Sequence, residues 1–178
     1  RDFVEFPSQV NEHWAWQPGR VLPAEWLDKL RAASEFGLGY AKAEALIAAV
    51  LDYAWHSTPL DELPTAVDDV AAFEAAALER HGLVDELVPP RYRSQYFAHI
   101  WGGGYAASYY GYTWAEVLDA DAVAWFEENG GGTRANGDHF RSTLLGVGGG
   151  IDPMETYRRF RGRDPELQPL LKRLGLTI

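Results

Sequence analysis

The chain has 178 residues, a formal net charge of -10 and a hydrophobic share of 47% with many Trp, Tyr and Phe side chains. This length suits one domain or one lobe of a larger protein, and the apolar content is sufficient for a packed core and argues against disorder. The acidic balance argues against a nucleic-acid interface, no apolar run approaches the roughly 20 residues of a membrane span, and the absence of cysteine excludes a disulfide framework and a thiolate metal site.

The first predicted helix covers about the first 17 residues. Asp2 is predicted to cap it with Glu5 as the third helical residue, the pattern of a capping box. Pro7 then falls about one turn inside, where it costs a hydrogen bond. Apolar residues at near-helical spacing predict a buried stripe that consists of Phe3, Phe6, Val10 and Trp14.

Further helices follow at regular intervals. One begins at Pro23, and a longer one covers about 40–56. Another is capped by Asp68 or Asp69 and ends near Gly82. The face predicted to be buried in the long helix consists of Leu46, Ile47, Val50, Leu51 and Ala54.

The last part of the chain is also predicted to be helical. A helix over 119–128 is followed by one that Thr133 opens, and then by two that begin with the same Asp-Pro pair, 152–153 and 164–165. Gly175 closes the final one. Because no alternating strand pattern or internal repeat occurs, the predicted class is all-α.

The segment over 96–114 has the most unusual composition. It contains His99, three consecutive glycines over 102–104, and tyrosines at helical spacing over 105–112. Glycines allow close approach of a ligand, and an imidazole with two hydroxyls could hold a carbonyl oxygen that gains negative charge. The segment therefore suits a binding cleft on a tyrosine-bearing helix. The plainer alternative is an amphipathic helix whose tyrosines are half-buried core.

The sequence does not contain a complete metal motif. Its histidines are His13, His56, His81, His99 and His139, and none lies four residues from another, so the His-Glu-x-x-His zinc motif is absent. A catalytic zinc site normally takes three protein ligands and a water. From the residues alone, Glu5 is either a local cap partner or a carboxylate ligand.

Two segments resemble a known family. Arg-Asp-Phe-Val-Glu-Phe-Pro-Ser-Gln-Val-Asn-Glu-His-Trp over 1–14, and Pro-Pro-Arg-Tyr-Arg-Ser over 89–94 running into 96–114, closely resemble the thimet-oligopeptidase-like zinc metallopeptidases. The Asn-Glu-His-Trp and Gly-Gly-Gly-Tyr-Ala-Ala runs are most similar to the bacterial peptidyl-dipeptidases of that family. The resemblance implies a multi-helix C-terminal lobe of a zincin-type oligopeptidase, with residues 1–178 as the C-terminal part of the catalytic domain. The upstream helix with His-Glu-x-x-His is not in this sequence.

The resemblance also implies roles for particular residues. Glu5 matches the family's third zinc ligand, whereas His99, Tyr105 and Tyr112 match residues that bind the peptide carbonyl and stabilise the oxyanion. The glycine run Gly102, Gly103 and Gly104 would contact the bound peptide. For Arg91 and Arg93 two interpretations stay open: binding of a peptide carboxylate, or surface ion pairs.

The resulting expectation is a zinc peptidyl-dipeptidase or oligopeptidase whose zinc site is incomplete in this chain. The chain alone is expected to be inactive, with short peptides and the missing N-terminal portion of the same protein as partners, and with no nucleic acid or membrane. The alternative is a non-catalytic helical peptide-binding module. A His-Glu-x-x-His motif about 25 residues upstream of Glu5 would separate the two. The expected compartment is the cytoplasm, with the periplasm as the alternative.

Overall fold

The computed structural model of the protein describes residues 1–19 and 21–176, and the regular elements in these ranges are all helices. The all-α prediction is confirmed. The chain forms two compact units: unit 1 comprises Arg1–Asp2 and Arg31–Thr113, and unit 2 comprises Phe3–Leu30 and the chain from Trp114 onward. Helix α2 (Ala24–Glu35) runs from unit 2 into unit 1. None of the helices in the described part of the chain has the length and apolar character needed to cross a membrane.

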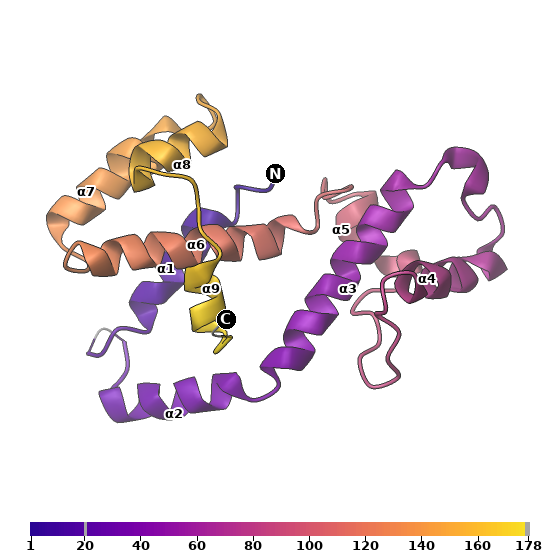
Figure 1. The fold of residues 1–178 in the computed structure, drawn as a ribbon, viewed down its shortest axis with the longest axis horizontal. Helices are drawn as coiled ribbons and strands as arrows, with labels where there is room; N and C mark the ends of the chain where they lie inside the picture. Colours follow the sequence, from indigo (N-terminus) through magenta and orange to yellow (C-terminus); the bar gives the residue numbers. More distant parts are fainter. Residues whose placement is uncertain (20, 177–178) are drawn as a thin grey trace. The chain divides into compact units, whose positions relative to one another are not determined.

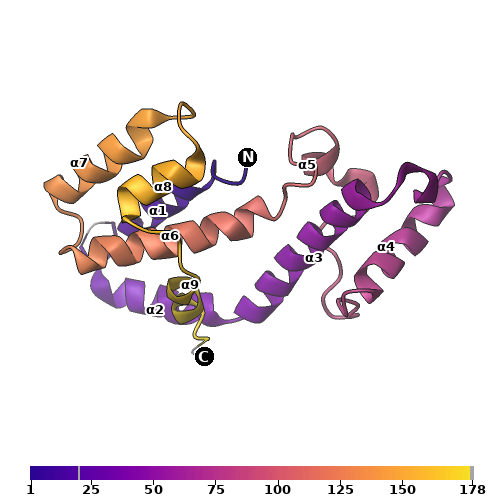
Figure 2. The ribbon, with the colours of Figure 1, turned by 45° about the horizontal axis from the view of Figure 1, so that its top comes forward.

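Unit 1 is built on two helices, α3 (Leu38–Ser57) and α4 (Val70–Glu79), which lie side by side (Figure 1, Figure 2). The predicted long helix is therefore present, and it begins after Gly37, whose positive φ of 73° suits glycine. The two helices pack through Ile47, Leu51, Ala77 and Leu78, with Val50 and Ala54 partly buried against them. The prediction for Leu46 is wrong, because its side chain is 47% exposed.

Short 3₁₀ turns connect the helices of unit 1. The acidic loop after α3 contains η1 (Leu60–Glu62) and η2 (Val67–Asp69), and η2 leads directly into α4. Asp69 occupies the cap position of α4, but its side chain makes no capping hydrogen bond, because its backbone already has helical angles. The predicted side-chain cap is therefore wrong, although the helix begins at the predicted place.

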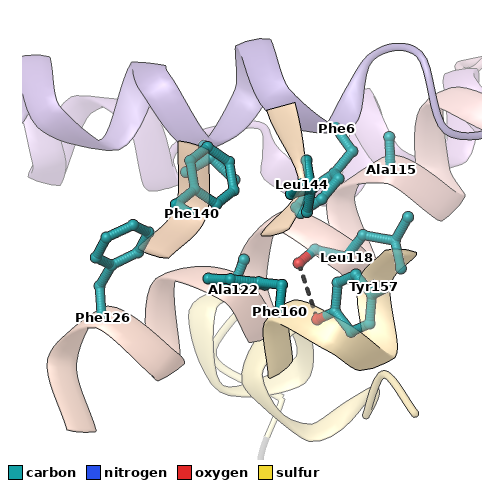
Figure 3. Packing of buried hydrophobic residues seen from close by; sticks show 10 residues of the cluster. Phe6, Ala115, Leu118, Ala122, Phe126, Phe140, Leu144, Tyr157 and Phe160 are labelled. Carbon is teal, nitrogen blue, oxygen red and sulfur yellow. Dashed lines mark hydrogen bonds between the residues drawn. The ribbon is translucent and has the colours of Figure 1, made fainter. Parts of the chain in front are cut away.

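Unit 2 contains α1 (Phe6–Ala15), most of α6 (Gly111–Glu128), α7 (Arg134–Thr143), η4 (Leu145–Val147), α8 (Pro153–Arg161) and α9 (Gln168–Arg173). Helix α6 begins before residue 119, the start predicted from the sequence. Figure 3 shows aromatic and aliphatic side chains of α1, α6, α7 and α8 meeting in one core. The buried members are Phe6, Val10, Ala115, Leu118, Ala122, Phe126, Phe140, Leu144, Tyr157 and Phe160.

The apolar stripe of the first helix faces this core as predicted. Phe6 and Val10 are fully buried, and Phe3 and Trp14 pack against them. The predicted capping box is wrong: the helix begins at Phe6, with Glu5 at the cap position and no side-chain cap bond. Pro7 consequently lies in the first turn, where a missing N–H costs nothing because the first amides of a helix have no partner within it.

The later helix starts are partly as predicted. The Thr133 hydroxyl accepts a hydrogen bond from the Asn136 amide, and Asp152 accepts from the amides of Met154 and Glu155, so both predicted caps are confirmed. The start predicted at 164–165 is wrong, since α9 begins only at Gln168. Asp164 instead accepts a 2.6 Å hydrogen bond from Arg158, which fixes the turn after α8.

Two buried carboxylates on α6 anchor the C-terminal segment of unit 2. Asp119 forms a forked pair with Arg173, with both distances 2.8 Å. Asp121, fully buried, accepts from the Tyr157 hydroxyl at 2.8 Å and from the guanidinium groups of Arg161 and Arg163 at 2.7 to 3.1 Å. Burial opposes ionisation of Asp121, but the hydrogen bonds and the Arg charge outweigh it, so its pKa lies below the ordinary value.

Candidate functional site

A pocket of about 780 Å³ opens on unit 1 around helix α5 (Ala98–Trp101). It contains five of the seven residues that the sequence analysis singled out, and a sixth, Gly104, lies between two of them in the chain. The lining residues are Gln95, Tyr96, Ala98, His99, Trp101, Gly102, Gly103, Tyr105 and Tyr112. The predicted cleft is therefore a concave site formed by residues of unit 1 alone.

The glycine run folds back tightly over α5. The amides of Gly102 and Gly103 both donate to the Ala98 carbonyl at 2.9 Å, and the Tyr105 amide donates to the His99 carbonyl at 3.0 Å. A Cβ at Gly103 would lie 2.9 Å from the Cα and the carbonyl oxygen of His99, closer than real contacts allow. Gly104 has a φ of 78°, and its carbonyl accepts from the Arg1 guanidinium at 3.1 Å. Glycine is therefore required here by the fold itself.

Changing Gly103 to Ala is expected to destabilise the chain by about 1–3 kcal/mol, because the new methyl group must displace the His99 backbone. Gly102→Ala is the matched control: its Cβ would find its nearest neighbour at 3.9 Å, an ordinary contact, and should cost far less. Urea unfolding of both variants, followed by Trp fluorescence, measures the difference. Equal stability of the two variants would contradict this account of the glycine run.

The tyrosine-bearing helix predicted over residues 105–112 is wrong. Residues 105–110 form consecutive turns, and α6 begins only at Gly111. Ala107 adopts a φ of 51°, a left-handed angle that an α-helix does not contain. The turns nevertheless bring the predicted side chains together. The rings of Tyr105 and Tyr112 stack with centroids 5.2 Å apart, and the His99 ring lies 5.9 Å from Tyr105 and 6.4 Å from Tyr112.

A buried carboxylate of α3 supports these turns. Asp52 is 1% exposed, and its two oxygens accept the amide hydrogens of Ala107 at 2.9 Å and Tyr109 at 2.7 Å. His56 Nδ1 lies 2.9 Å from the same carboxylate. Tyr109 packs in the core beneath the pocket, 5.6 Å from the His99 ring and 5.1 Å from the Tyr112 ring. Burial raises the pKa of Tyr109, so its phenol stays protonated.

The other wall of the pocket is fixed through Ser94, in η3 (Ser94–Tyr96). Its amide donates to the buried Glu74 of α4, its hydroxyl accepts from the Trp55 indole at 2.7 Å, and its carbonyl accepts from the Trp101 indole at 2.6 Å. Ser94 thus connects α3, α4 and α5 through hydrogen bonds to one residue of each. Because the partners are buried or half-buried, the wall has few alternative arrangements.

The two arginines before the pocket form ion pairs. Arg93 contacts Glu74 at 3.2 Å, and Arg91 lies 3.8 Å from Glu44. Of the two interpretations left open by the sequence, pairing within the protein is the one that these contacts favour. The guanidinium carbon of Arg1 lies 4.5 Å from the centre of the Tyr105 ring, within reach of a cation–π interaction.

Glu5 belongs to unit 2, whereas the residues that line the pocket belong to unit 1. It is half-buried at the cap position of α1, and its side chain makes no cap bond there, so the local cap role considered for it is not its role. Among the described residues no group of three or more His, Cys, Asp or Glu side chains could hold a metal ion. The described part of the chain therefore does not form a complete metal site by itself.

Sequence reasoning missed the residues that hold the pocket in shape. Asp52 and Glu74 are nearly fully buried acids on helices whose apolar faces were recognised. No sequence signal pointed to Asp52, because it lies beside Ala48 on the side of the helix opposite to the face predicted to be buried. A buried acid needs buried donors, and for Asp52 these are the backbone amides of Ala107 and Tyr109.

The pocket brings an imidazole and two phenols together beside the tightly folded glycine run. Residues 1–176 match Peptidase family M3, and the chain belongs to this family. It is 46% identical to the dipeptidyl carboxypeptidase of Escherichia coli (strain K12), over 100% of this chain and 28% of that protein.

Other relatives agree with this assignment. The dipeptidyl carboxypeptidase of Salmonella typhimurium is 46% identical over 99% of this chain and 27% of its own length. Oligopeptidase A of Escherichia coli is 35% identical over 98% of this chain and 27% of its own length. The chain thus spans little more than a quarter of the length of these three relatives, each of which bears a peptidase name.

Proposed function

We propose that the chain is the substrate-binding portion of a zinc peptidyl-dipeptidase, in which His99, Tyr105 and Tyr112 hold the peptide carbonyl and Glu5 supplies one zinc ligand. The single observation that carries the proposal is the convergence of the imidazole and two phenols on one pocket with the glycine run. The names of the most similar relatives support removal of dipeptides from peptide C-termini.

The chemistry follows from the donors of the pocket. A peptide carbonyl that is attacked by water develops negative charge on its oxygen, and donors placed at that oxygen stabilise the transition state more than the ground state. The phenols of Tyr105 and Tyr112 are such donors, and both residues are half-buried where they line the pocket. His99 can donate from whichever ring nitrogen carries its proton.

Glu5 is the one zinc ligand that we propose for this chain. When bound, zinc in such a site supplies Lewis acidity toward the peptide carbonyl and the water. The remaining ligands would come from an upstream His-Glu-x-x-His helix, which puts two histidines on one helical face. We therefore propose that the isolated chain does not hydrolyse peptides, because one carboxylate does not make a catalytic zinc site.

The proposed function is tested by measuring the release of dipeptides from a pentapeptide that is blocked at its N-terminus and has a free C-terminus. The complete protein should release C-terminal dipeptides, lose this activity to a chelator and regain it with added zinc. The isolated chain should release none at equal concentration. Hydrolysis by the isolated chain, or hydrolysis by the complete protein that resists chelation, would contradict the proposal.

Tyr112→Phe is expected to lower kcat of the complete protein by about 10² to 10³, the usual effect of removing one oxyanion donor, with a smaller change in KM. Tyr110→Phe is the matched control, because Tyr110 lies two residues away, outside the pocket, with its hydroxyl 3.4 Å from Asp2. Steady-state kinetics on one peptide measures both. A loss of similar size in the two variants would indicate that the phenol of Tyr112 is not the stabilising group.

The alternative function is a peptide-binding module without catalysis. It is favoured by one observation, that His99, Tyr105 and Tyr112 line one pocket with the glycine run and could hold a peptide carbonyl without a metal. Calorimetric titration of the complete protein with a non-hydrolysable peptide, with and without chelator, separates the two functions. Metal-independent binding without any hydrolysis would support the module, and chelator-sensitive turnover would exclude it.

A further inference from the structure

The carboxylate of Asp52 is hydrogen-bonded to the backbone of the turns over 105–110. One oxygen accepts the Ala107 amide hydrogen and the other accepts the Tyr109 amide hydrogen. The side chain is 1% exposed, so water cannot replace either bond. Asp52 thus bridges two amides that lie between the pocket residues Tyr105 and Tyr112, from a helix more than 50 residues earlier in the chain.

The turn that Asp52 holds has an unfavourable backbone. Ala107 has a φ of 51°, which places its Cβ close to the backbone, and a non-glycine residue keeps such an angle only where neighbouring bonds enforce it. Other bonds of the turn are local, such as those from the Ser108 amide to the Tyr105 carbonyl and from the Gly111 amide to the Ser108 carbonyl, and the exposed Tyr110 hydroxyl lies 3.4 Å from Asp2. The bonds from Asp52 are therefore those that tie this turn to the helical core.

The position of the turn decides where the phenols lie. Tyr105 precedes Ala107 by two residues, Tyr112 follows Tyr109 by three, and their rings stack at 5.2 Å with an angle of 12° between the planes. Tyr109 itself lies in the core against both His99 and Tyr112. A relaxed turn would separate the two stacked rings while leaving helices α3 and α4 packed through their own side chains.

We propose that Asp52 is a positioning residue, which sets the distance between the phenols of Tyr105 and Tyr112 by holding the amides of Ala107 and Tyr109. The expected effect on kcat rests on the proposed function. The expected effect on the position of the turn rests on the two hydrogen bonds alone. Displacement of a catalytic group by about 1 Å can cost about 10²-fold in rate. Asp52→Ala in the complete protein is therefore expected to lower kcat by about that factor while KM changes little.

Asp52→Asn keeps the size of the side chain and retains one acceptor oxygen. Its NH₂ group must face one of the two amides, so one bond is lost and the other is retained. This variant should have an intermediate kcat, and it keeps the test valid if Asp52→Ala does not fold. Asp119→Ala is the control, because Asp119 is an equally buried helical acid in unit 2 that binds Arg173.

A mutant cycle separates positioning from general loss of structure. If Asp52 acts through the phenols, Asp52→Ala lowers kcat about 10²-fold in the native protein and adds little in the Tyr105→Phe, Tyr112→Phe background. A loss by the same factor in both backgrounds, as expected for Asp119→Ala, would overturn the proposal.

Hydrogen exchange of the complete protein, measured by mass spectrometry on peptides covering residues 105–112, gives a second readout that needs no activity. Faster exchange in Asp52→Ala and Asp52→Asn, with unchanged exchange in Asp119→Ala, supports the positioning role. Unchanged exchange in the Asp52 variants overturns it. If the native protein shows no hydrolysis, the proposed function fails and the exchange result alone decides the role of Asp52.

Discussion

A complete protein that carries Glu5→Ala is expected to lose peptide hydrolysis and most of its bound zinc. The reason is ligand number: a catalytic zinc site uses three protein ligands, and removal of the carboxylate leaves two. Helix α1 should persist in the variant, because its start does not depend on a side-chain bond from Glu5. Zinc content per protein after gel filtration, together with dipeptide release, measures the effect.

Glu12→Ala is the matched control for this experiment. Glu12 is an exposed acid on the same helix, so its removal changes the net charge by the same amount without touching the proposed site. This variant should keep both its zinc and its activity. Full zinc occupancy and turnover in Glu5→Ala would show that the third ligand is another residue.

The largest effect on stability is expected at Asp121 in unit 2. Asp121→Ala should destabilise the chain by about 3–5 kcal/mol, because it leaves Arg161, Arg163 and the Tyr157 hydroxyl without the buried acceptor that they share. Urea unfolding followed by Trp fluorescence measures the change. Asp138→Ala is the control, since Asp138 also pairs with an arginine, Arg134, but at the exposed surface, and its loss should change stability little.

The same carboxylate should make the chain sensitive to acid. The pKa of Asp121 is lower in the folded chain than its ordinary value of about 3.9, so the folded state favours the ionised form. Its contribution is then fully present above the unfolded pKa and is lost as pH falls through the folded pKa. Unfolding free energy should therefore fall below about pH 4, and less steeply in Asp121→Asn. Parallel pH profiles for both proteins would contradict this assignment.

Much of the candidate site could be predicted because its residues are close in sequence. His99, the glycine run, Tyr105 and Tyr112 lie within 14 positions, so almost any compact folding of the segment brings them near one another. The pocket contains five of these six residues. The conformation of the segment was nevertheless predicted wrongly, because tyrosine spacing alone does not distinguish a helix from a series of turns held by a distant carboxylate.

The hydrogen-bond partners of the buried acids could not be predicted from the sequence. Asp52, Glu74, Asp119 and Asp121 all lie in helices, but nothing local specifies which donor each one meets. His56 is a local partner of Asp52, but the other partners named here come from 19 to 57 residues away. They are Arg93 and Ser94 for Glu74, the amides of Ala107 and Tyr109 for Asp52, and three C-terminal arginines for the two acids of α6.

The sequence by itself determined the all-α class, most helix positions, two of the caps and the side chains of the candidate site, because periodicity, proline and capping residues act within a few positions of one another. The tertiary structure decided the start of α1, the late start of α9, the turns over 105–110 and the place of every buried acid. These features depend on donors and apolar surfaces brought together from distant parts of the chain, and such contacts outweigh local preference.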